Sequence, residues 1–428
     1  MLYLAAILVA SPYLLYAAIR YGKYREGWRQ KLLGSVPIRS GKNRCIWLHA
    51  VSVGEVNLLA PLIARWDAQY PDWECVISTT TLAGYALARK RYAPRTVFYC
   101  PLDFTWSVRR AIRRMRPDLL VLAELELWPN LVAAAKQAGA KVAIINGRLS
   151  DKSLRGYQRI GFLARKTLEQ IDLVAAQNEE YAQRFRQLGA LPSAVAVTRS
   201  IKFDGAIADR QNPATKRLAA LAGIEETDQV FLAGSTQEPE ESLAVAVYSK
   251  LVAQHPKLRL ILVPRHPERF EEVARMLEKS GVPWQRRSLL ESEGPKPQAR
   301  ILLVDTIGEL TAWWGTAAIA FVGGSLGKRG GQNMIEPAAY GAAVCFGPNT
   351  WNFRDVVEML LAREAAVVVQ DGTELKGFVR RCLENPDYAQ VLGQNARALV
   401  LEQLGAADRT VELLSALVSS QTASRRAA

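Results

Sequence analysis

Short apolar stretches alternate with amphipathic helical segments along almost the whole chain, and this alternation constrains the fold more than any other feature. In the first half we expect strands within residues 45–50, 74–79, 96–99, 119–122, 141–146 and 173–177. After a pause around residues 199–211, we expect further strands at 230–233, 258–263, 300–304, 318–322 and 342–346. Apolar strands that alternate with helices predict parallel sheets covered by helices on both faces. We therefore expect an α/β protein with two Rossmann-like, doubly wound domains that face a cleft.

The division into domains follows from the same pattern. We expect residues 23–200 to form an N-terminal domain and residues 201–420 to form a C-terminal domain that includes the last helices. Within the first domain, the apolar periodicity predicts one long helix over residues 154–170.

The N-terminal 19 residues carry no charged side chain and are rich in Leu, Ala, Ile and Tyr. A helix of that length extends about 28 Å at about 1.5 Å per residue, close to the ~30 Å hydrocarbon core of a bilayer. Eight basic residues follow by Arg44, with Glu26 as the only acid among them. This asymmetry predicts that the body of the protein stays on the cytoplasmic side of the inner membrane. We expect residues 1–22 to form a membrane anchor or a helix that lies in the interface, and both alternatives remain open.

The 428 residues carry a formal net charge of +14, which favours an acidic partner such as an anionic membrane or a phosphorylated substrate. No aromatic-basic motif of a nucleic-acid binding protein is present, so we expect no nucleic-acid partner. The basic run from Arg109 to Arg116 is either a phosphate-facing patch or a solvated helix face. The five cysteines form no CxxC pair and only three histidines exist, so we expect neither a metal site nor a cofactor.

A glycine-rich segment, Gly330-Gly331-Gln332-Asn333-Met334-Ile335-Glu336-Pro337, follows the apolar stretch 318–322 and its Gly323-Gly324-Ser325 turn. Glycines allow backbone amides to approach a ligand closely, and the residues after them are expected to begin a helix. Free amides and partial positive charge at a helix start suit a phosphate group. The segment predicts a nucleotide-type ligand in the C-terminal domain, although a simple strand-to-helix turn would give the same pattern.

Acidic residues follow two of the expected strands of the N-terminal domain. Glu55 comes after the first strand, where it can act as a general base or simply complement a helix dipole. Glu124 and Glu126 follow the strand at 119–122, and they share a face only if that segment is extended. Lys202, at the proposed domain boundary, can neutralise a developing anion.

Three further loops follow strands of the C-terminal domain. They contain Ser235 and Thr236, then Pro264 and Arg265, then the segment 305–310. Because the carboxyl ends of parallel strands meet at one edge of a sheet, these loops and the glycine-rich segment are expected to converge there.

These segments together resemble the 3-deoxy-D-manno-octulosonic acid (Kdo) transferases of lipid A biosynthesis. The matching segments occur in the order of that family and span nearly the whole chain. They are HAVSVGE (49–55), ELELWPN (124–130), NGRLS (146–150), AAQNEEYAQRF (175–185), IKFD (201–204), AGSTQEPEES (233–242), LVPRHPERF (262–270), DTIGEL (305–310), FVGGSL (321–326), GGQNMIEPAAYG (330–341) and FGPNTWNF (346–353).

The resemblance implies a GT-B glycosyltransferase with the acceptor in the N-terminal domain and the donor in the C-terminal domain. It implies CMP-Kdo as donor, a tetra-acylated and bis-phosphorylated lipid A precursor as acceptor, inversion at the anomeric carbon and no metal. It also implies that Glu55 is the general base and that Glu124 and Lys202 stabilise the transition state. The implied donor contacts are Pro264, Arg265, Ile307, Gly308, Glu309, Asn333, Met334, Ile335 and Glu336, to which the loop analysis adds Ser235, Thr236 and Gly331.

The chain departs from the usual pattern of that family at a few positions. They are Gln332 and Gln237 in place of histidine, Ile307 in place of methionine, Gly147 in place of alanine, and Arg199-Ser200 where glycine is typical. None of these departures removes Glu55, Lys202 or Glu336.

Two other classes of function remain as alternatives. A GT-B enzyme of another kind, such as a transferase with a UDP-sugar donor or a sugar-nucleotide epimerase, would use the same sheet-edge loops. A non-catalytic basic protein that binds membranes or nucleic acid would account for the net charge alone.

Overall fold

The computed structural model describes residues 26–427, which form two compact units. The first unit contains residues up to 204 together with residues from 403 onwards, and the second contains residues 205–402. The expected anchor at residues 1–22 lies outside the described residues. No helix within residues 26–427 is both long and apolar enough to cross a membrane.

The described part of the first unit is built on a seven-stranded parallel sheet with the order β3-β2-β1-β4-β5-β6-β7. Its strands are β1 (Cys45–His49), β2 (Glu74–Thr79), β3 (Val97–Tyr99), β4 (Leu119–Ala123), β5 (Lys141–Gly147), β6 (Leu173–Ala176) and β7 (Val195–Val197). Its helices are α2 (Trp28–Leu33), α3 (Val53–Gln69), α4 (Leu82–Arg91), α5 (Thr105–Met115), α6 (Pro129–Gln137), α7 (Asp151–Gln158), α8 (Gly161–Leu168), α9 (Glu179–Leu188) and α19 (Ala406–Ala427).

The second unit contains its own seven-stranded parallel sheet, with the order β10-β11-β9-β8-β12-β13-β14. Its strands are β8 (Gln229–Thr236), β9 (Leu258–Pro264), β10 (Trp284–Arg286), β11 (Ile301–Leu303), β12 (Ile319–Val322), β13 (Ala343–Phe346) and β14 (Ala366–Val368). Its helices are α10 (Pro213–Leu221), α11 (Glu240–Leu251), α12 (Phe270–Ser280), α13 (Leu290–Glu293), α14 (Leu310–Trp314), α15 (Ile335–Ala339), α16 (Arg354–Ala362), α17 (Gly372–Glu384) and α18 (Pro386–Gln403), which ends at the boundary.

Strands of both sheets are buried on both faces, as apolar strands of a parallel sheet require. In β1, for example, Trp47 packs into one apolar cluster of the first unit, whereas Ile46 and Leu48 pack into the cluster on the opposite face. Alternate side chains therefore supply two cores, each covered by its own helices. The expected α/β architecture with two parallel-sheet domains is confirmed.

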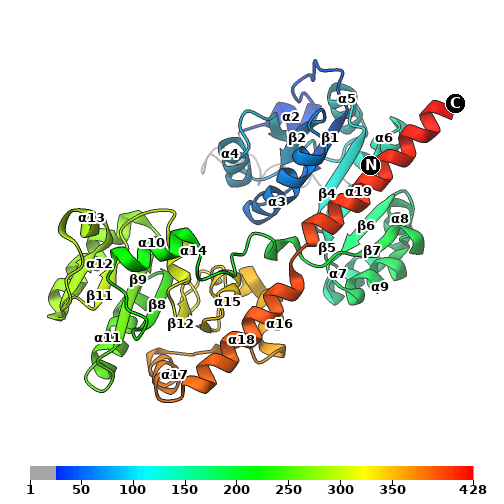
Figure 1. Ribbon diagram of the computed structural model, residues 1–428. Helices are drawn as coiled ribbons and strands as arrows, with labels where there is room; N and C mark the ends of the chain where they lie inside the picture. The colour runs from blue at the N-terminus through cyan, green and yellow to red at the C-terminus, as the bar shows by residue number, and fades with distance from the viewer. Residues whose placement is uncertain (1–25, 428) are drawn as a thin grey trace, which may run out of the picture. The chain divides into compact units, whose positions relative to one another are not determined.

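The last helix does not belong to the unit to which the sequence assigned it. In α19, Ala407, Val411, Leu414 and Val418 are buried in the apolar cluster that also contains Leu48 of β1. Figure 1 shows α19 beside the strands of the first sheet. The expected C-terminal domain of residues 201–420 is therefore corrected, because the chain returns to the first unit to cover an apolar face of its sheet.

The single long helix expected over residues 154–170 is also corrected, because α7 and α8 are separate helices. The amide of Ile160 donates to Tyr157 O at 3.0 Å, a bond across three residues that tightens the chain and ends α7. Gly161 then begins α8. Residues 159–160 therefore form a corner between two helices and are not the middle of one continuous helix.

Each sheet has a switch point, at which two neighbouring strands lead to their next strands in opposite directions. In the first sheet this switch lies between β1 and β4, and in the second it lies between β8 and β12. In open α/β sheets, ligands bind outside the carboxyl ends of the strands at such switch points. The loops that follow these four strands are therefore where the topology places a site in each unit.

Candidate active site

Glu55 follows β1 at the switch point of the first unit, and a reciprocal cap at the start of α3 fixes its carboxylate. Ser52 is the N-cap residue of α3, and its hydroxyl oxygen accepts from the amide of Glu55 at 3.4 Å. In return, Glu55 Oε1 accepts from the Ser52 hydroxyl at 2.9 Å, and Oε2 accepts from the Val51 amide at 2.8 Å. This cap resembles a capping box, except that Glu55 accepts from the amide before the N-cap residue, and it holds both carboxylate oxygens in one orientation.

Glu124 follows β4, the neighbour of β1, and forms an ion pair with Lys202. Glu124 Oε1 lies 3.0 Å from Lys202 Nζ. Glu124 has a φ of 58°, and its amide donates to Ile145 O at 2.9 Å, so the backbone turns sharply as it leaves the sheet. Lys202 is held from both sides, because its neighbours Ile201 and Phe203 are buried. The structure thus brings together the acid and the cation that the sequence paired only through a resemblance.

Glu126 is a third acid at this place, and the site residues selected from the sequence did not include it. Trp128 Nε1 donates to Glu126 Oε2 at 2.7 Å. Burial first, and then the charge of Glu55, raise the pKa of Glu126 to about 7. The charge of Glu124 contributes to this shift as well, and both acids of the ELEL segment interact electrostatically with Glu55. The alternation of acids in the sequence was a signal for this residue, and the structure resolves which way each one points.

The pKa of Glu55 is raised as well, chiefly by burial, with a smaller contribution from the negative charge of Glu124. The hydrogen bonds from Val51 and Ser52 act in the opposite direction, because they stabilise the carboxylate. A partly buried carboxylate with a raised pKa is a better proton acceptor than one in water. The arrangement can therefore take a proton from a hydroxyl, with Lys202 as the nearby positive charge.

In the second unit, the Gly323-Gly324-Ser325 turn after β12 is occupied by a side chain of the protein itself. Glu240, at the start of α11, accepts from the amides of Gly324, Ser325 and Leu326 at 2.7, 2.9 and 3.0 Å. Its carboxylate also accepts from the amide of Gln237 at 2.9 Å. These amides are therefore not available to a ligand, because a buried carboxylate already uses them.

The amides available to a ligand lie further along the glycine-rich segment. Gly331 has a φ of 79°, and its amide donates to Gly324 O at 2.8 Å, which closes the loop. In the described part of the chain, the amides of Gln332, Asn333 and Met334 donate no hydrogen bond. The expected helix after them is α15, which is only five residues long. The loop backbone, more than a helix dipole, is what this segment can offer to a phosphate.

Glu336 lies beside this loop and is held by two hydrogen bonds. Asn333 Nδ2 donates to Glu336 Oε1 at 2.9 Å, and Thr311 Oγ1 donates to Oε2 at 3.0 Å. Burial is the largest influence on Glu336 and raises its pKa, while both hydrogen bonds and the charge of Arg265 act in the opposite direction. The structure therefore brings Arg265 and Glu336 into one site. Thr311 is a member of this group that the sequence did not suggest.

Arg265 is positioned by the end of the second sheet's switch-point strand. Its amide donates to Thr236 O at 3.0 Å, and Thr236 is paired with Pro264 in the register of β8 and β9. Ser235, just before, has a left-handed φ of 54°, a strained conformation that is typical of functional loops. The loop residues that were expected to converge at this edge of the sheet do lie together, namely Ser235, Thr236, Pro264 and Arg265.

The side chain of Glu309 is not free to contact a ligand. Its two oxygens accept from Arg287 Nε and Nη2 at 2.8 and 2.7 Å, and Thr306 Oγ1 donates to Oε2 at 2.8 Å. What the segment offers instead is its backbone, where Gly308 has a φ of 90° and Ile307 has an exposed side chain. The expected donor contact through Glu309 is therefore restricted to main-chain atoms.

Two parallel-sheet α/β units, each with polar groups gathered at its switch point, define a GT-B-like class of protein. The solved UDP-GlcNAc 2-epimerase from Neisseria meningitidis has a similar fold, with a TM-score of 0.56 and 14% identity over 87% of this chain and 99% of that one.

The comparisons with known sequences are more specific. The model of the family described as 3-Deoxy-D-manno-octulosonic-acid transferase (kdotransferase) matches residues 24–205. The 3-deoxy-D-manno-octulosonic acid transferase of Bordetella pertussis is 33% identical over 94% of this chain and 91% of its own length. The transferase of that name from Haemophilus influenzae is 32% identical over 96% of this chain and 94% of its own length. The chain belongs to the Kdo transferase family.

Proposed function

We propose that the protein transfers Kdo from CMP-Kdo to a hydroxyl of the tetra-acylated lipid A precursor, in lipopolysaccharide biosynthesis. The family relationship over nearly the full length of the chain supports the reaction class. The observation that supports the mechanism is the orientation of Glu55, whose carboxylate is fixed by Ser52 and Val51 beside the pair Glu124–Lys202.

In the proposed reaction, Glu55 takes the proton of the acceptor hydroxyl. The hydroxyl oxygen forms a bond to the anomeric carbon of Kdo, and the bond from that carbon to the phosphate oxygen of CMP breaks. CMP leaves with the bonding electron pair, and the configuration at the anomeric carbon inverts. Lys202 stabilises negative charge that develops in the transition state, and Glu124 holds its ammonium group in place.

The donor is held by the second unit. Arg265 meets the phosphate of CMP, the amides of residues 332–334 donate to it, and Glu336 accepts from the ribose hydroxyls. Ser235, Thr236 and the backbone at Ile307, Gly308 and Glu309 complete the donor contacts. No metal ion takes part, because the leaving group is a nucleoside monophosphate.

The proposed place of action is the cytoplasmic face of the inner membrane, where the acyl chains of the acceptor are embedded. The uncharged stretch at residues 1–19 and the basic residues that follow it support this location. Deletion of residues 1–19 is expected to lower the share of the protein in the membrane fraction and raise its share in the soluble fraction. An unchanged distribution would show that residues 1–19 do not anchor the protein to the membrane.

The alternative function, a GT-B enzyme with a UDP-sugar donor, differs from the proposed function in its donor. We would incubate the full-length protein with the lipid acceptor and either CMP-Kdo or UDP-N-acetylglucosamine, and measure release of CMP or UDP. The proposal predicts acceptor-dependent release of CMP only. Release of UDP without CMP would instead support a GT-B enzyme with a UDP-sugar donor.

A further inference from the structure

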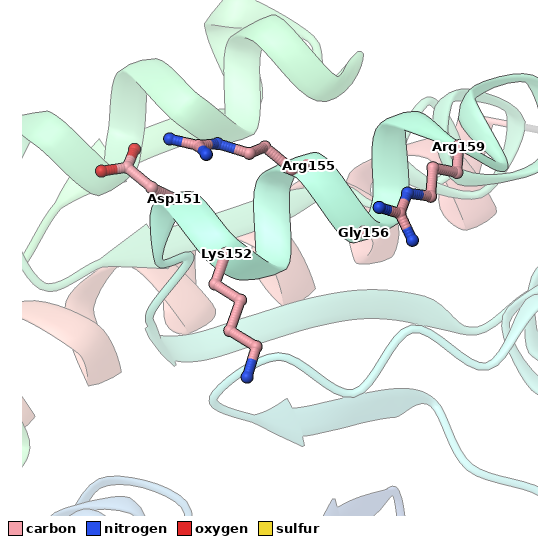
Figure 2. Close-up of a pocket in the computed structure, with 5 residues that line it drawn as sticks. All are labelled: Asp151, Lys152, Arg155, Gly156 and Arg159. Atoms are coloured by element: carbon pink, nitrogen blue, oxygen red, sulfur yellow. The ribbon is translucent and has the colours of Figure 1, made fainter.

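The corner between α7 and α8 presents cationic groups on the first unit. A hollow of about 510 Å³ lies along α7 and is lined by Asp151, Lys152, Arg155, Gly156 and Arg159 (Figure 2). Residues three and four positions apart lie on one side of a helix, so the three cations form a stripe along α7.

Large apolar side chains continue this surface where α7 ends. Phe162 is 82% exposed, and Ile160 and Leu163 are also exposed. The inner side of α8 is already filled, because Ala164 and Leu168 are buried in the core. The three exposed side chains are therefore not needed for packing within the unit, and a cluster of this kind marks a surface that contacts something else.

The charge around the corner is strongly positive. Exposed Arg165 and Lys166 on α8 add to the cations of α7. Of the nearby acids, Asp151 and Glu180 are both engaged by Arg184, and Glu179 is engaged by Arg186. Glu169 is a further exposed acid on α8. A soluble apolar partner would leave these cations uncompensated, and an acidic soluble protein would leave the apolar side chains without a partner.

The inner face of α7 borders the candidate active site. Tyr157 packs against the same apolar cluster as Trp128, which donates to Glu126. Burial first, and then the negative charge of Glu126, raise the pKa of Tyr157. One short helix thus has the candidate carboxylates on one side and the cationic stripe on another.

We propose that the α7–α8 corner is the surface with which this protein docks on an anionic lipid bilayer. Lys152, Arg155 and Arg159 contact phosphate headgroups, while Phe162 and its apolar neighbours enter the boundary between headgroups and acyl chains. The inference deepens the proposed function, on which it rests for a lipid acceptor, and it places the candidate carboxylates next to the membrane surface.

The cysteines of the protein make a local test possible. All five native cysteines are buried, so Phe162→Cys in the full-length protein supplies one accessible thiol for the environment-sensitive dye NBD. We expect its emission to rise and shift to the blue on vesicles of phosphatidylcholine with phosphatidylglycerol. Val391→Cys, at a 55% exposed position of α18 in the second unit, is the matched control and is expected to show no change. This signal is local, so it is independent of any anchoring by residues 1–19.

The cationic stripe is tested in the same labelled protein. The triple variant K152Q/R155Q/R159Q is expected to need on the order of tenfold more anionic lipid, or more, for a half-maximal response. The variant R89Q/K90Q/R91Q removes the same charge from exposed positions at the end of α4 and is expected to shift the response less than about twofold. Circular dichroism of each variant checks that the fold is retained.

Four results would overturn the proposal. They are unchanged emission at position 162, an equal change at position 391, an equal effect of the two triple variants, and a response that appears only when the lipid acceptor is added to neutral vesicles. The last result would assign the corner to the acceptor itself. CMP release by the unlabelled protein on the same vesicles separates this inference from the proposed function, since transfer without an emission change contradicts only the docking surface.

Discussion

Lys202 Nζ lies 3.0 Å from Glu124 Oε1, and both side chains remain accessible, at 28% and 26% exposure. Such a pair contributes little to stability, because water screens both charges. Its position after β4, beside the loop of Glu55, is better explained by what the ammonium group can do for a reacting substrate. A substitution at Lys202 can therefore test a catalytic role without a large effect on stability.

Lys202→Met is therefore expected to reduce the transfer rate by about 10²–10³-fold. The same change is expected to lower the free energy of unfolding by only about 0.2–1 kcal/mol. Steady-state kinetics and chemical denaturation measure the two effects. Turnover within about twofold of the wild type, or a loss of activity that merely follows unfolding, would contradict the assigned role.

Glu126 gives a prediction about pH. Its pKa is about 7 in the folded protein, against an ordinary value of 4.5, because burial disfavours its charged form. The folded state therefore binds the proton more tightly than the unfolded state, and stability falls as pH rises between about 4.5 and 7. Above about pH 7, this loss of stability no longer changes with pH.

Glu126→Gln removes the charge and should remove this penalty. We expect the variant to be more stable than the wild type by about 1–2 kcal/mol at pH 8, a figure reduced for the partial exposure of the site. At pH 4 the two proteins should be equally stable. Urea denaturation at both pH values measures the difference, and a stabilisation of equal size at both would show that the carboxyl does not titrate as described.

The carboxylate of Glu240 organises the loop after β12, and its removal should be costly. Glu240→Ala leaves the amides of Gln237, Gly324, Ser325 and Leu326 without their acceptor. We expect a loss of about 3–5 kcal/mol in the free energy of unfolding.

Glu238→Ala is the matched control, because that nearby acid is exposed and should cost less than about 0.5 kcal/mol. Thermal and chemical denaturation compare the two variants. Similar small losses in both would mean that the turn does not depend on the buried carboxylate.

Thr311 provides a test of the donor site that leaves the shape of the side chain unchanged. Thr311→Val removes the hydrogen bond to Glu336 Oε2 and is expected to weaken CMP binding about fivefold, the effect of about 1 kcal/mol. Calorimetric titration with CMP measures it. Thr316→Val, where the hydroxyl donates to Trp313 O, is the control and should leave the affinity unchanged. Equal CMP affinity in the wild type and both variants would show that Thr311 does not contribute to the donor site.

Much of the fold follows from the sequence, because a strand buried on both faces must be continuously apolar. Strands such as β1 and β4 were predicted within a residue or two for that reason. The edge strands β7, β10 and β14 were missed, whereas β3, of the same length, was predicted. A segment of three residues carries little periodic signal. The place of α19 was also missed, because contacts between residues far apart in the chain leave no local pattern.

The candidate site was likewise predicted only in part from the sequence. The loops after parallel strands were predicted to converge, and Glu55, Glu124 and Lys202 do lie in one unit at its switch point. The alternating acids of the sequence pointed to Glu126 but left open whether it shares a face with Glu124, because only the left-handed backbone of Glu124 settles where each acid points. The sequence did not indicate that Glu240 fills the Gly323-Gly324-Ser325 turn, since 84 residues separate that acid from Gly324.

The most direct measurement of the central claim is the mass of the lipid acceptor after incubation with CMP-Kdo and either the wild-type protein or Glu55→Gln. Glutamine can keep the cap of α3, so folding and CMP affinity should be unchanged while the proton acceptor is lost. We predict addition of Kdo by the wild type and a rate at least about 10²-fold lower for the variant. An acceptor of unchanged mass with the folded wild type, or equal rates for the two proteins, would contradict it.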